Sequence, residues 1–130
     1  MEEALGVGQA KIEEYFQACR KQMHTAAKGC AFHNWHHVAD VTQCLYTVLL
    51  KTGLNNALTT EQLIAVFLAA PAHDLDHRGT NNSYEGLLGS QLAKLYSTST
   101  MERHHFDTCI TIMSAPDNNI LCNLSVDDYK

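Results

Sequence analysis

One short polar stretch, at the end of the longest apolar run, constrains the fold of this chain most. Residues 63–72 are all apolar, and the next five, His73-Asp74-Leu75-Asp76-His77, bring two imidazoles and two carboxylates beside them. The run predicts a buried helix, and its continuation puts His73 and His77, four residues apart, on one face. Burying such groups is costly unless something binds them, and imidazoles with carboxylates suit zinc and similar metals. We therefore predict a divalent metal site here.

Two further segments of the sequence are rich in histidine, His33-Asn34-Trp35-His36-His37 and Glu102-Arg103-His104-His105. His33 and His37 are again four residues apart. One such histidine alone is more often structural than a ligand, but paired clusters beside two apolar helices favour a shared site. His104 and His105 point in different directions on a helix, so at most one of them faces that site. Glu102 fits two interpretations, a capping box or a carboxylate that hydrogen-bonds metal-held water.

Apolar residues recur at three- and four-residue steps in most of the sequence, and no segment alternates as a strand would. We therefore predict an all-α fold, a multi-helix bundle, with helices at about residues 8–24, 34–52, 59–79 and 99–114, a short helix within 87–96 and the start of another at 125–128. Asn34 is the expected N-cap of the second helix, and Gly53 is expected to end it. Thr59-x-x-Gln62 and Ser99-x-x-Glu102 both match the capping-box pattern. Pro71 removes one backbone hydrogen bond from the third helix and is expected to kink it.

Length, composition and charge limit the kinds of protein that this chain can be. With 130 residues the chain is one domain at most, and 45% hydrophobic and 18% charged residues argue against disorder. A net charge of -5 gives no support for nucleic acid as a partner. Five cysteines without C-x-x-C spacing indicate reduced thiols, mostly buried in helices, and a cytoplasmic location. There is no signal-peptide pattern, and the longest apolar run is about half of the ~20 residues that span a bilayer.

Taken in order, these motifs resemble the class I cyclic nucleotide phosphodiesterases, which belong to the HD metal-dependent phosphohydrolases. The similarity rests on Phe32-His33-Asn34-Trp35-His36-His37, on residues 73–82 and on residues 95–106. It extends from about residue 30 to the C-terminus and is greatest to the cyclic GMP-specific, photoreceptor and dual-specificity subfamilies that carry GAF domains. The family's catalytic domains are more than twice this length, so the resemblance implies that residues 1–130 are the N-terminal portion of one.

The resemblance implies two divalent metal ions, a tightly held zinc and a magnesium or manganese. By this comparison His37, His73 and Asp74 are the zinc ligands, and Asp74 also bridges to the second metal. Two such ions activate a water and stabilise both oxygens of an in-line displacement. The family's fourth zinc ligand, an Asp, and its purine-binding Gln lie downstream of Lys130, so the resemblance implies an incomplete site in this chain.

Further roles follow from the same resemblance. His33 is the general acid that protonates the leaving O3′ oxygen, a contribution worth roughly 10²–10⁴-fold in rate. His77 and Glu102 are outer groups that hydrogen-bond the hydroxide and the waters held by the metals. Asn82 and His105 match motif positions with supporting roles.

Three functions are compatible with these motifs. The leading one is metal-dependent hydrolysis of 3′,5′-cyclic nucleotides (cyclic GMP, cyclic AMP or both) to 5′-monophosphates in signal transduction, by the domain of which this chain is a part. The second is a non-catalytic regulatory fragment that forms a homodimer or pairs with full-length enzyme, and the absence of the downstream ligands favours it. The third is another HD-family nucleotide phosphohydrolase, against which the His33-Asn34-x-x-His37 motif argues.

Overall fold

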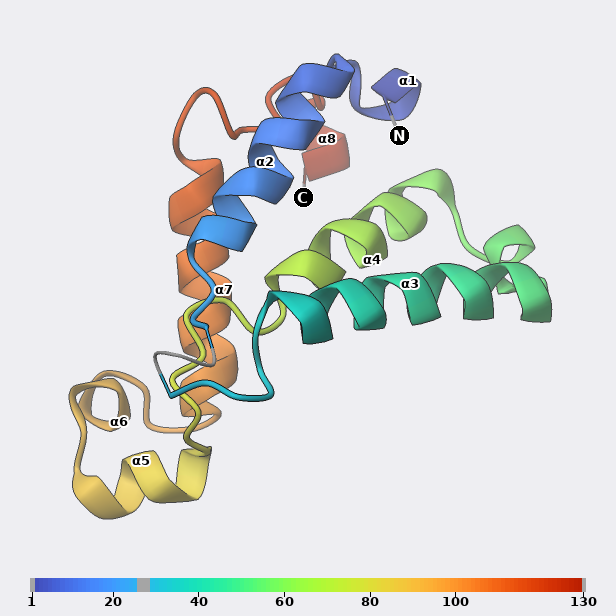
Figure 1. Ribbon diagram of the computed structural model, residues 1–130. Coiled ribbons are helices and arrows are strands. Elements are labelled where there is room, and N and C mark those ends of the chain that lie inside the picture. The colour runs from blue at the N-terminus through green and yellow to red at the C-terminus, as the bar shows by residue number, and fades with distance from the viewer. Residues whose placement is uncertain (1, 26–28, 130) are drawn as a thin grey trace.

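The structure, a computed structural model, describes residues 2–25 and 29–129 (Figure 1). Within these residues it is all-α, as predicted, and has no strand. The helices in chain order are α1 (Glu2–Leu5), α2 (Gln9–Lys21), α3 (Trp35–Thr52), the 3₁₀ helix η2 (Leu54–Asn56), α4 (Thr60–Ala72), α5 (Asn82–Leu88), α6 (Gln91–Leu95), α7 (Thr100–Met113) and α8 (Val126–Tyr129). None of these helices has the length and apolar character that crossing a bilayer requires.

Two pairs of helices meet near the start of α3 and the end of α4 (Figure 1). α3 and α4 lie side by side as an antiparallel hairpin joined through η2, while α2 lies along α7. α5 and α6 form a small lobe that packs against the first part of α7. The loop between α4 and α5 runs through the junction of these units, so the polar stretch that follows the apolar run lies at the centre of the fold.

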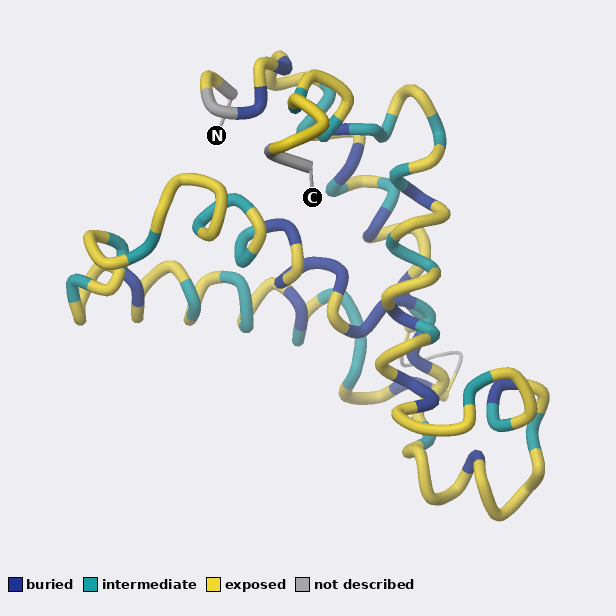
Figure 2. The backbone as a smooth tube through the Cα atoms, turned by 180° about the vertical axis from the view of Figure 1, so that it is seen from behind, coloured by how far each residue is buried: buried dark blue, intermediate teal, exposed yellow. Residues whose placement is uncertain are grey.

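The core lies where α2, α4 and α7 meet. Its buried members are Tyr15, Cys19, Met23, Val38, Leu68, Ala72, Leu75, Ile112 and Ile120. Tyr15 is fully buried, and its hydroxyl donates to the Leu68 carbonyl at 2.9 Å, which ties α2 to α4. Figure 2 shows buried positions concentrated at this junction, whereas most of α3 and α5 is exposed or half-buried.

Local capping signals set the ends of the two hairpin helices. Asn34 precedes α3 and accepts a hydrogen bond from the His36 N–H at 3.0 Å, and Gly53 ends α3 with a φ of 71°. Thr59 and Gln62 make both hydrogen bonds of a capping box at the start of α4. These predictions are confirmed, because each of them depends on contacts within a single turn.

Other boundary predictions are wrong. α2 ends at Lys21, three residues earlier than predicted, and α5 was not predicted at these bounds, whereas α6 lies within residues 87–96, where a short helix was predicted. The second capping box does not form, because Ser99 has a φ of 49° and makes no side-chain cap. Instead the side-chain oxygen of Asn82 accepts from the Met101 N–H at 2.8 Å. The cap of α7 therefore comes from another helix, which no local pattern predicts.

The cysteine prediction is confirmed in part. All five cysteines are free thiols, but only Cys19 and Cys30 are buried, and only the first of these lies in a helix. Cys44 and Cys122 are exposed. Cys44 lies on the solvent side of α3, because α4 covers only part of that helix.

Candidate metal centre

The polar stretch after α4 is a loop, and not the helical continuation that its spacing predicted. α4 ends at Ala72, and turns follow it. Asp76 has a φ of 54°, in the left-handed region, and its N–H donates to the Gln22 carbonyl just after α2, at 3.2 Å. A right-handed helix cannot continue through that conformation, so His73 and His77 do not share a helix face.

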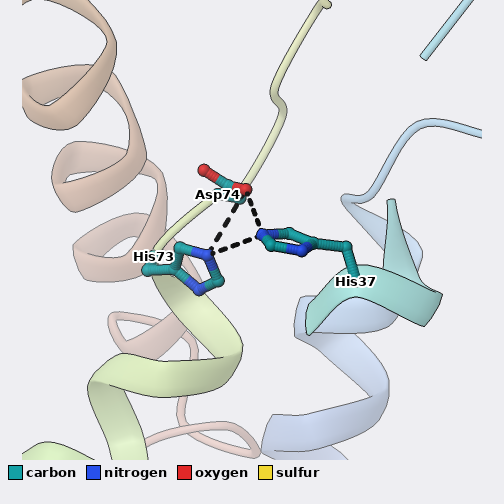
Figure 3. A group of neighbouring side chains, drawn as sticks. All are labelled: His37, His73 and Asp74. Carbon is teal, nitrogen blue, oxygen red and sulfur yellow. Dashed lines mark hydrogen bonds and ion pairs between the residues drawn. The ribbon is translucent and has the colours of Figure 1, made fainter. Parts of the chain in front are cut away.

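The loop nevertheless brings three of the predicted residues together (Figure 3). His37 comes from the first turn of α3, His73 directly follows α4, and Asp74 is the next residue. His37 Nε2 and His73 Nε2 each lie 3.3 Å from Asp74 Oδ2 and 3.4 Å from each other. The three atoms form a nearly equilateral triangle, with Asp74 buried and His73 open to solvent.

This triangle fits a divalent metal. Nitrogen and oxygen ligands about 2.0–2.1 Å from a tetrahedral zinc lie about 3.3–3.4 Å apart, the spacing found here. Asp74 Oδ2 is buried and has no hydrogen-bond partner, although two imidazole nitrogens lie close to it. An unsatisfied buried carboxylate oxygen is unfavourable, and a cation bound among these atoms removes the penalty.

The surroundings of His73 prepare it as a ligand. Its Nδ1 lies 2.7 Å from the Ala70 carbonyl, which can only accept, so Nδ1 carries a proton, and in the neutral ring Nε2 has a free lone pair. Such a backbone hydrogen bond is the usual way a metal-binding imidazole is oriented. Pro71 lies in the last turn of α4 and is fully buried, and the ligand triangle is regular in its presence.

Asp74 and His73 favour their charged forms when no metal is bound. Contact with the Asp74 carboxylate raises the pKa of His73, and this outweighs the lowering by burial. Burial alone would raise the pKa of Asp74, but the neighbouring imidazoles, His73 first, lower it below its usual range. A metal that binds here therefore displaces the proton that the charged His73 ring carries on Nε2.

A column of three imidazoles lies beside the triangle. His33 and His77 stack with ring centroids 3.9 Å apart and an angle of 15° between the planes, and His105 continues the column 5.5 Å from His77. His105 Nδ1 donates to the Leu75 carbonyl at 2.6 Å, and its Nε2 lies 3.9 Å from Asp74 Oδ1. Burial lowers the pKa of both His77 and His105, so both favour the neutral form.

His77 is placed as a donor and not as a ligand. Its Nδ1 accepts a hydrogen bond from the Gly79 N–H at 3.0 Å, so the neutral ring carries its proton on Nε2. Asp74, His77 and His105 lie close enough to form a second candidate metal group. This second group is the poorer metal site of the two, because neither nitrogen of the His77 ring has a free lone pair. Nδ1 accepts from the Gly79 N–H, and Nε2 carries the proton.

Glu102 lies in the first turn of α7, exposed, and the Asn82 amide donates to its Oε2 at 3.0 Å. Asn82 thus caps α7 and orients Glu102 at the same time. Glu102, His73 and His105 line one open groove of about 750 Å³ between α4 and α7. The other lining side chains are mostly apolar and include Leu68, Phe106 and Ile110.

Sequence reasoning missed one cluster next to this site. His24 and His104 both contact Asp76, whose carboxylate had no expected role. No pattern in the sequence links His24 to residues fifty positions later, so only the three-dimensional structure reveals this contact.

Comparisons with known proteins show the family to which the chain belongs. A family model described as 3'5'-cyclic nucleotide phosphodiesterase matches residues 32–130. The chain belongs to this family. Dual 3',5'-cyclic-AMP and -GMP phosphodiesterase 11 of Drosophila melanogaster is 46% identical over 102 residues, which are 78% of this chain and 7% of that protein. The cGMP-specific 3',5'-cyclic phosphodiesterase of Drosophila virilis is 45% identical over 100 residues, which are 76% of this chain and 11% of that protein.

Among solved structures, the phosphodiesterase domain of the RhoPDE fusion protein from the choanoflagellate Salpingoeca rosetta superimposes with a TM-score of 0.89 at 30% sequence identity. The match covers 98% of this chain and 39% of that one. The chain thus has the fold of part of a phosphodiesterase domain, and it spans about a tenth of the length of the curated relatives that it matches.

Proposed function

We propose that this chain forms the metal-binding part of an enzyme active site that hydrolyses 3′,5′-cyclic nucleotides to 5′-monophosphates. The observation that carries the proposal is the triangle of His37, His73 and Asp74, with edges of 3.3, 3.3 and 3.4 Å and an unsatisfied carboxylate oxygen. Family membership and the names of the relatives support cyclic AMP, cyclic GMP or both as substrates.

The metal assignment has two parts. His37, His73 and Asp74 are proposed to hold zinc, and Asp74 is proposed to be shared with a magnesium or manganese ion. Bound divalent cations supply the positive charge that offsets the phosphodiester anion and activates water. Two imidazoles and one carboxylate match the ligand preference of zinc.

His33 is proposed as the general acid that protonates the O3′ leaving group. Its side chain is half-buried, immediately before the N-cap of α3, and its backbone carbonyl accepts from the Cys30 thiol at 2.9 Å. The stack on His77 and an edge contact with His37 hold the ring beside the triangle. An imidazole has an ordinary pKa near neutrality and can therefore donate a proton to a departing alkoxide.

His77 and Glu102 are proposed to orient water at the site. The Nε2–H of neutral His77 is a donor, and the Glu102 carboxylate is an acceptor held in place by Asn82. A donor and an acceptor beside a metal centre can fix a water or hydroxide in one orientation.

The remaining proposals concern the whole protein. Residues 1–130 are proposed as the N-terminal portion of a catalytic domain, an assignment supported by a match to 39% of a solved phosphodiesterase chain. Five free thiols support a reducing, cytoplasmic compartment.

Metal binding and turnover of the chain test the proposal. Titration of metal-free protein with Co²⁺, followed by visible absorption, should show binding that His37→Ala abolishes. The matched control is His36→Ala, because His36 is the exposed neighbour on the same turn of α3. Hydrolysis of cyclic GMP and cyclic AMP is then measured with Mn²⁺. His33→Ala should retain Co²⁺ binding and lose roughly 10²–10⁴-fold in rate. Absence of Co²⁺ binding by the wild-type chain contradicts the proposal.

A second candidate is a non-catalytic module that associates with another copy of the chain or with full-length enzyme. The observation that favours it is the apolar groove between α4 and α7, together with Phe106 and Leu95, which are 63% and 69% exposed. Large exposed apolar surfaces mark interaction sites. Intact Co²⁺ binding without hydrolysis, with dimers seen in sedimentation analysis, favours this function over catalysis.

A further inference from the structure

Asp76 lies at the centre of a cluster of ionisable side chains that the proposed function does not use. Its Oδ1 lies 2.6 Å from His24 Nε2, and its Oδ2 lies 2.7 Å from His104 Nε2 and 3.2 Å from Arg78 Nη2. We call these four residues the Asp76 cluster. A carboxylate only accepts hydrogen bonds when it is ionised, so both imidazole nitrogens donate to it.

These contacts are hydrogen bonds and not ligand positions. Nitrogen–oxygen distances of 2.6 and 2.7 Å leave no room for an ion between the atoms, whereas 3.3 Å separates His37 from Asp74. Of the groups among the described residues that could hold a metal, both contain Asp74 and neither contains Asp76. Asp76 therefore has a role other than direct ligation.

The Asp76 cluster ties three separate parts of the chain. His24 follows α2, His104 lies in α7, and Asp76 lies in the loop after α4. The backbone adds a further tie, because the Asp76 N–H donates to the Gln22 carbonyl at 3.2 Å. The side chain and the N–H of Asp76 thus both anchor the loop to neighbouring elements.

The position of the Asp74 side chain depends on this anchoring of the loop. Its Oδ2 has no hydrogen-bond partner, so the loop backbone decides where that oxygen lies. On one side the Leu75 carbonyl accepts from His105 at 2.6 Å, and on the other Asp76 is in the left-handed conformation with a φ of 54°. A non-glycine residue keeps such a backbone only when its surroundings fix it.

We propose that Asp76 is a positioning residue for the metal centre. By accepting hydrogen bonds from His24 and His104 it fixes the left-handed turn, and the turn holds Asp74 at the apex of the ligand triangle. The inference rests on the proposed metal centre, and it adds a residue that contacts no ligand atom of that centre.

Two variants test the role. Asp76→Asn keeps the size of the side chain, and asparagine is tolerated at a positive φ, so only the charge and one acceptor are lost. His104→Leu removes one donor without touching the loop. The matched control is Asp107→Asn in α7, because that carboxylate accepts from the Tyr96 hydroxyl at 2.5 Å, in a contact that does not involve the loop.

The measurement is Co²⁺ titration of the 130-residue chain, with circular dichroism to check folding. Asp76→Asn and His104→Leu should each lower Co²⁺ affinity by about 10–100-fold and reach the wild-type absorption spectrum at saturation, since all ligands are present. The double variant should lose little more than Asp76→Asn alone, because both changes act through one contact. Asp107→Asn should bind as the wild type does. Wild-type affinity in both test variants, with only a lowered unfolding temperature, overturns the proposal.

A second measurement separates this inference from the metal centre itself. NMR spectra of the metal-free chain report the backbone environment of residues 73–79 directly. Asp76→Asn should shift the amide signals of Asp74, Leu75 and His77, and Asp107→Asn should leave them in place. If wild-type protein binds no Co²⁺ but these shifts occur, the metal centre is wrong and the positioning of the loop by Asp76 is retained. Unchanged loop signals in Asp76→Asn overturn the positioning role whatever the metal result.

Discussion

The imidazole rings of His33 and His77 stack face to face, with centroids 3.9 Å apart and planes 15° from parallel. Burial lowers the pKa of His77 below its ordinary value of 6.5, and a charge on His33 would lower it further. We therefore expect His77 to titrate below 6.5 in the metal-free chain, and His33→Ala to raise that pKa. Histidine NMR spectra in a pH series measure both values, with His36→Ala as the exposed control.

The same shift gives a direction to the pH dependence of stability. The unfolded chain binds the His77 proton at a higher pH than the folded chain, so acidification lowers the free energy of unfolding. His77→Gln removes this titration, and its stability should decline less between about pH 7 and 5. Urea unfolding at several pH values measures the decline. Equal declines in the two proteins contradict a lowered pKa for His77.

Asp74 and Asp76 provide a direct comparison of a ligand with a positioning residue. Asp74→Asn should lower Co²⁺ affinity by more than about 100-fold, because the loss of a ligand exceeds the loss of an outer contact. Asp76→Asn should cost less, since the triangle retains its three donors. Isothermal titration with the two variants measures the difference, and equal losses would remove the ligand role of Asp74.

The pKa of His73 should determine how metal affinity depends on pH. Metal binds the neutral imidazole, and contact with Asp74 raises the pKa of His73 above 6.5 in the metal-free chain. Affinity should therefore begin to fall above pH 6.5 as the solution is acidified, earlier than for an unperturbed histidine. Co²⁺ titrations between about pH 5.5 and 8 test this, and an affinity independent of pH contradicts ligation by histidine.

The buried hydroxyl of Tyr15 should contribute to stability. Tyr15→Phe removes the donor to the Leu68 carbonyl and should lower the free energy of unfolding by about 1 kcal/mol. Tyr46→Phe is the matched control, because that side chain is 54% exposed and its change should fall within about 0.5 kcal/mol of zero. Urea unfolding of both variants measures the difference, and equal effects contradict the contribution of the hydrogen bond.

The two capping-box sequences should respond differently to substitution. Thr59→Ala removes a complete capping box and should cost about 1 kcal/mol. Ser99→Gly should raise stability by up to about 1 kcal/mol, because a φ of 49° strains any residue with a Cβ and the Ser99 side chain makes no cap. Thermal unfolding distinguishes the two, and a comparable loss at both positions contradicts the assigned backbone of Ser99.

Local signals predicted the hairpin of α3 and α4 well. Asn34, Gly53 and the Thr59–Gln62 pair act within one turn, so the sequence around each helix end contains the whole interaction. The continuation of α4 to Gly79 was wrong for the opposite reason. The Asp76 contacts with Gln22 and with His24 come from a distant part of the chain and override helical spacing.

In the candidate site, too, some residues could be predicted from the sequence and others could not. Residue types and order identified His37, His73 and Asp74, and the fold places them together although the predicted shared helix face does not exist. The role of Asn82 could not be predicted, because its amide caps a helix 19 residues further on. The residue types of candidate metal ligands can thus be recognised in a sequence. The residues that position them are common polar residues, and only their place in the folded chain shows their role.

The opposed nitrogens of His37 and His73 come from residues 36 positions apart, at adjoining ends of α3 and α4. An ion bound between them would join these ends as a disulfide joins two cysteines, and would reduce the conformational entropy of the unfolded chain if it remained bound there. Loss of the ion would release this link between the first turn of α3 and the end of α4. Chelators should therefore loosen the contact between these two helix ends before they unfold either helix.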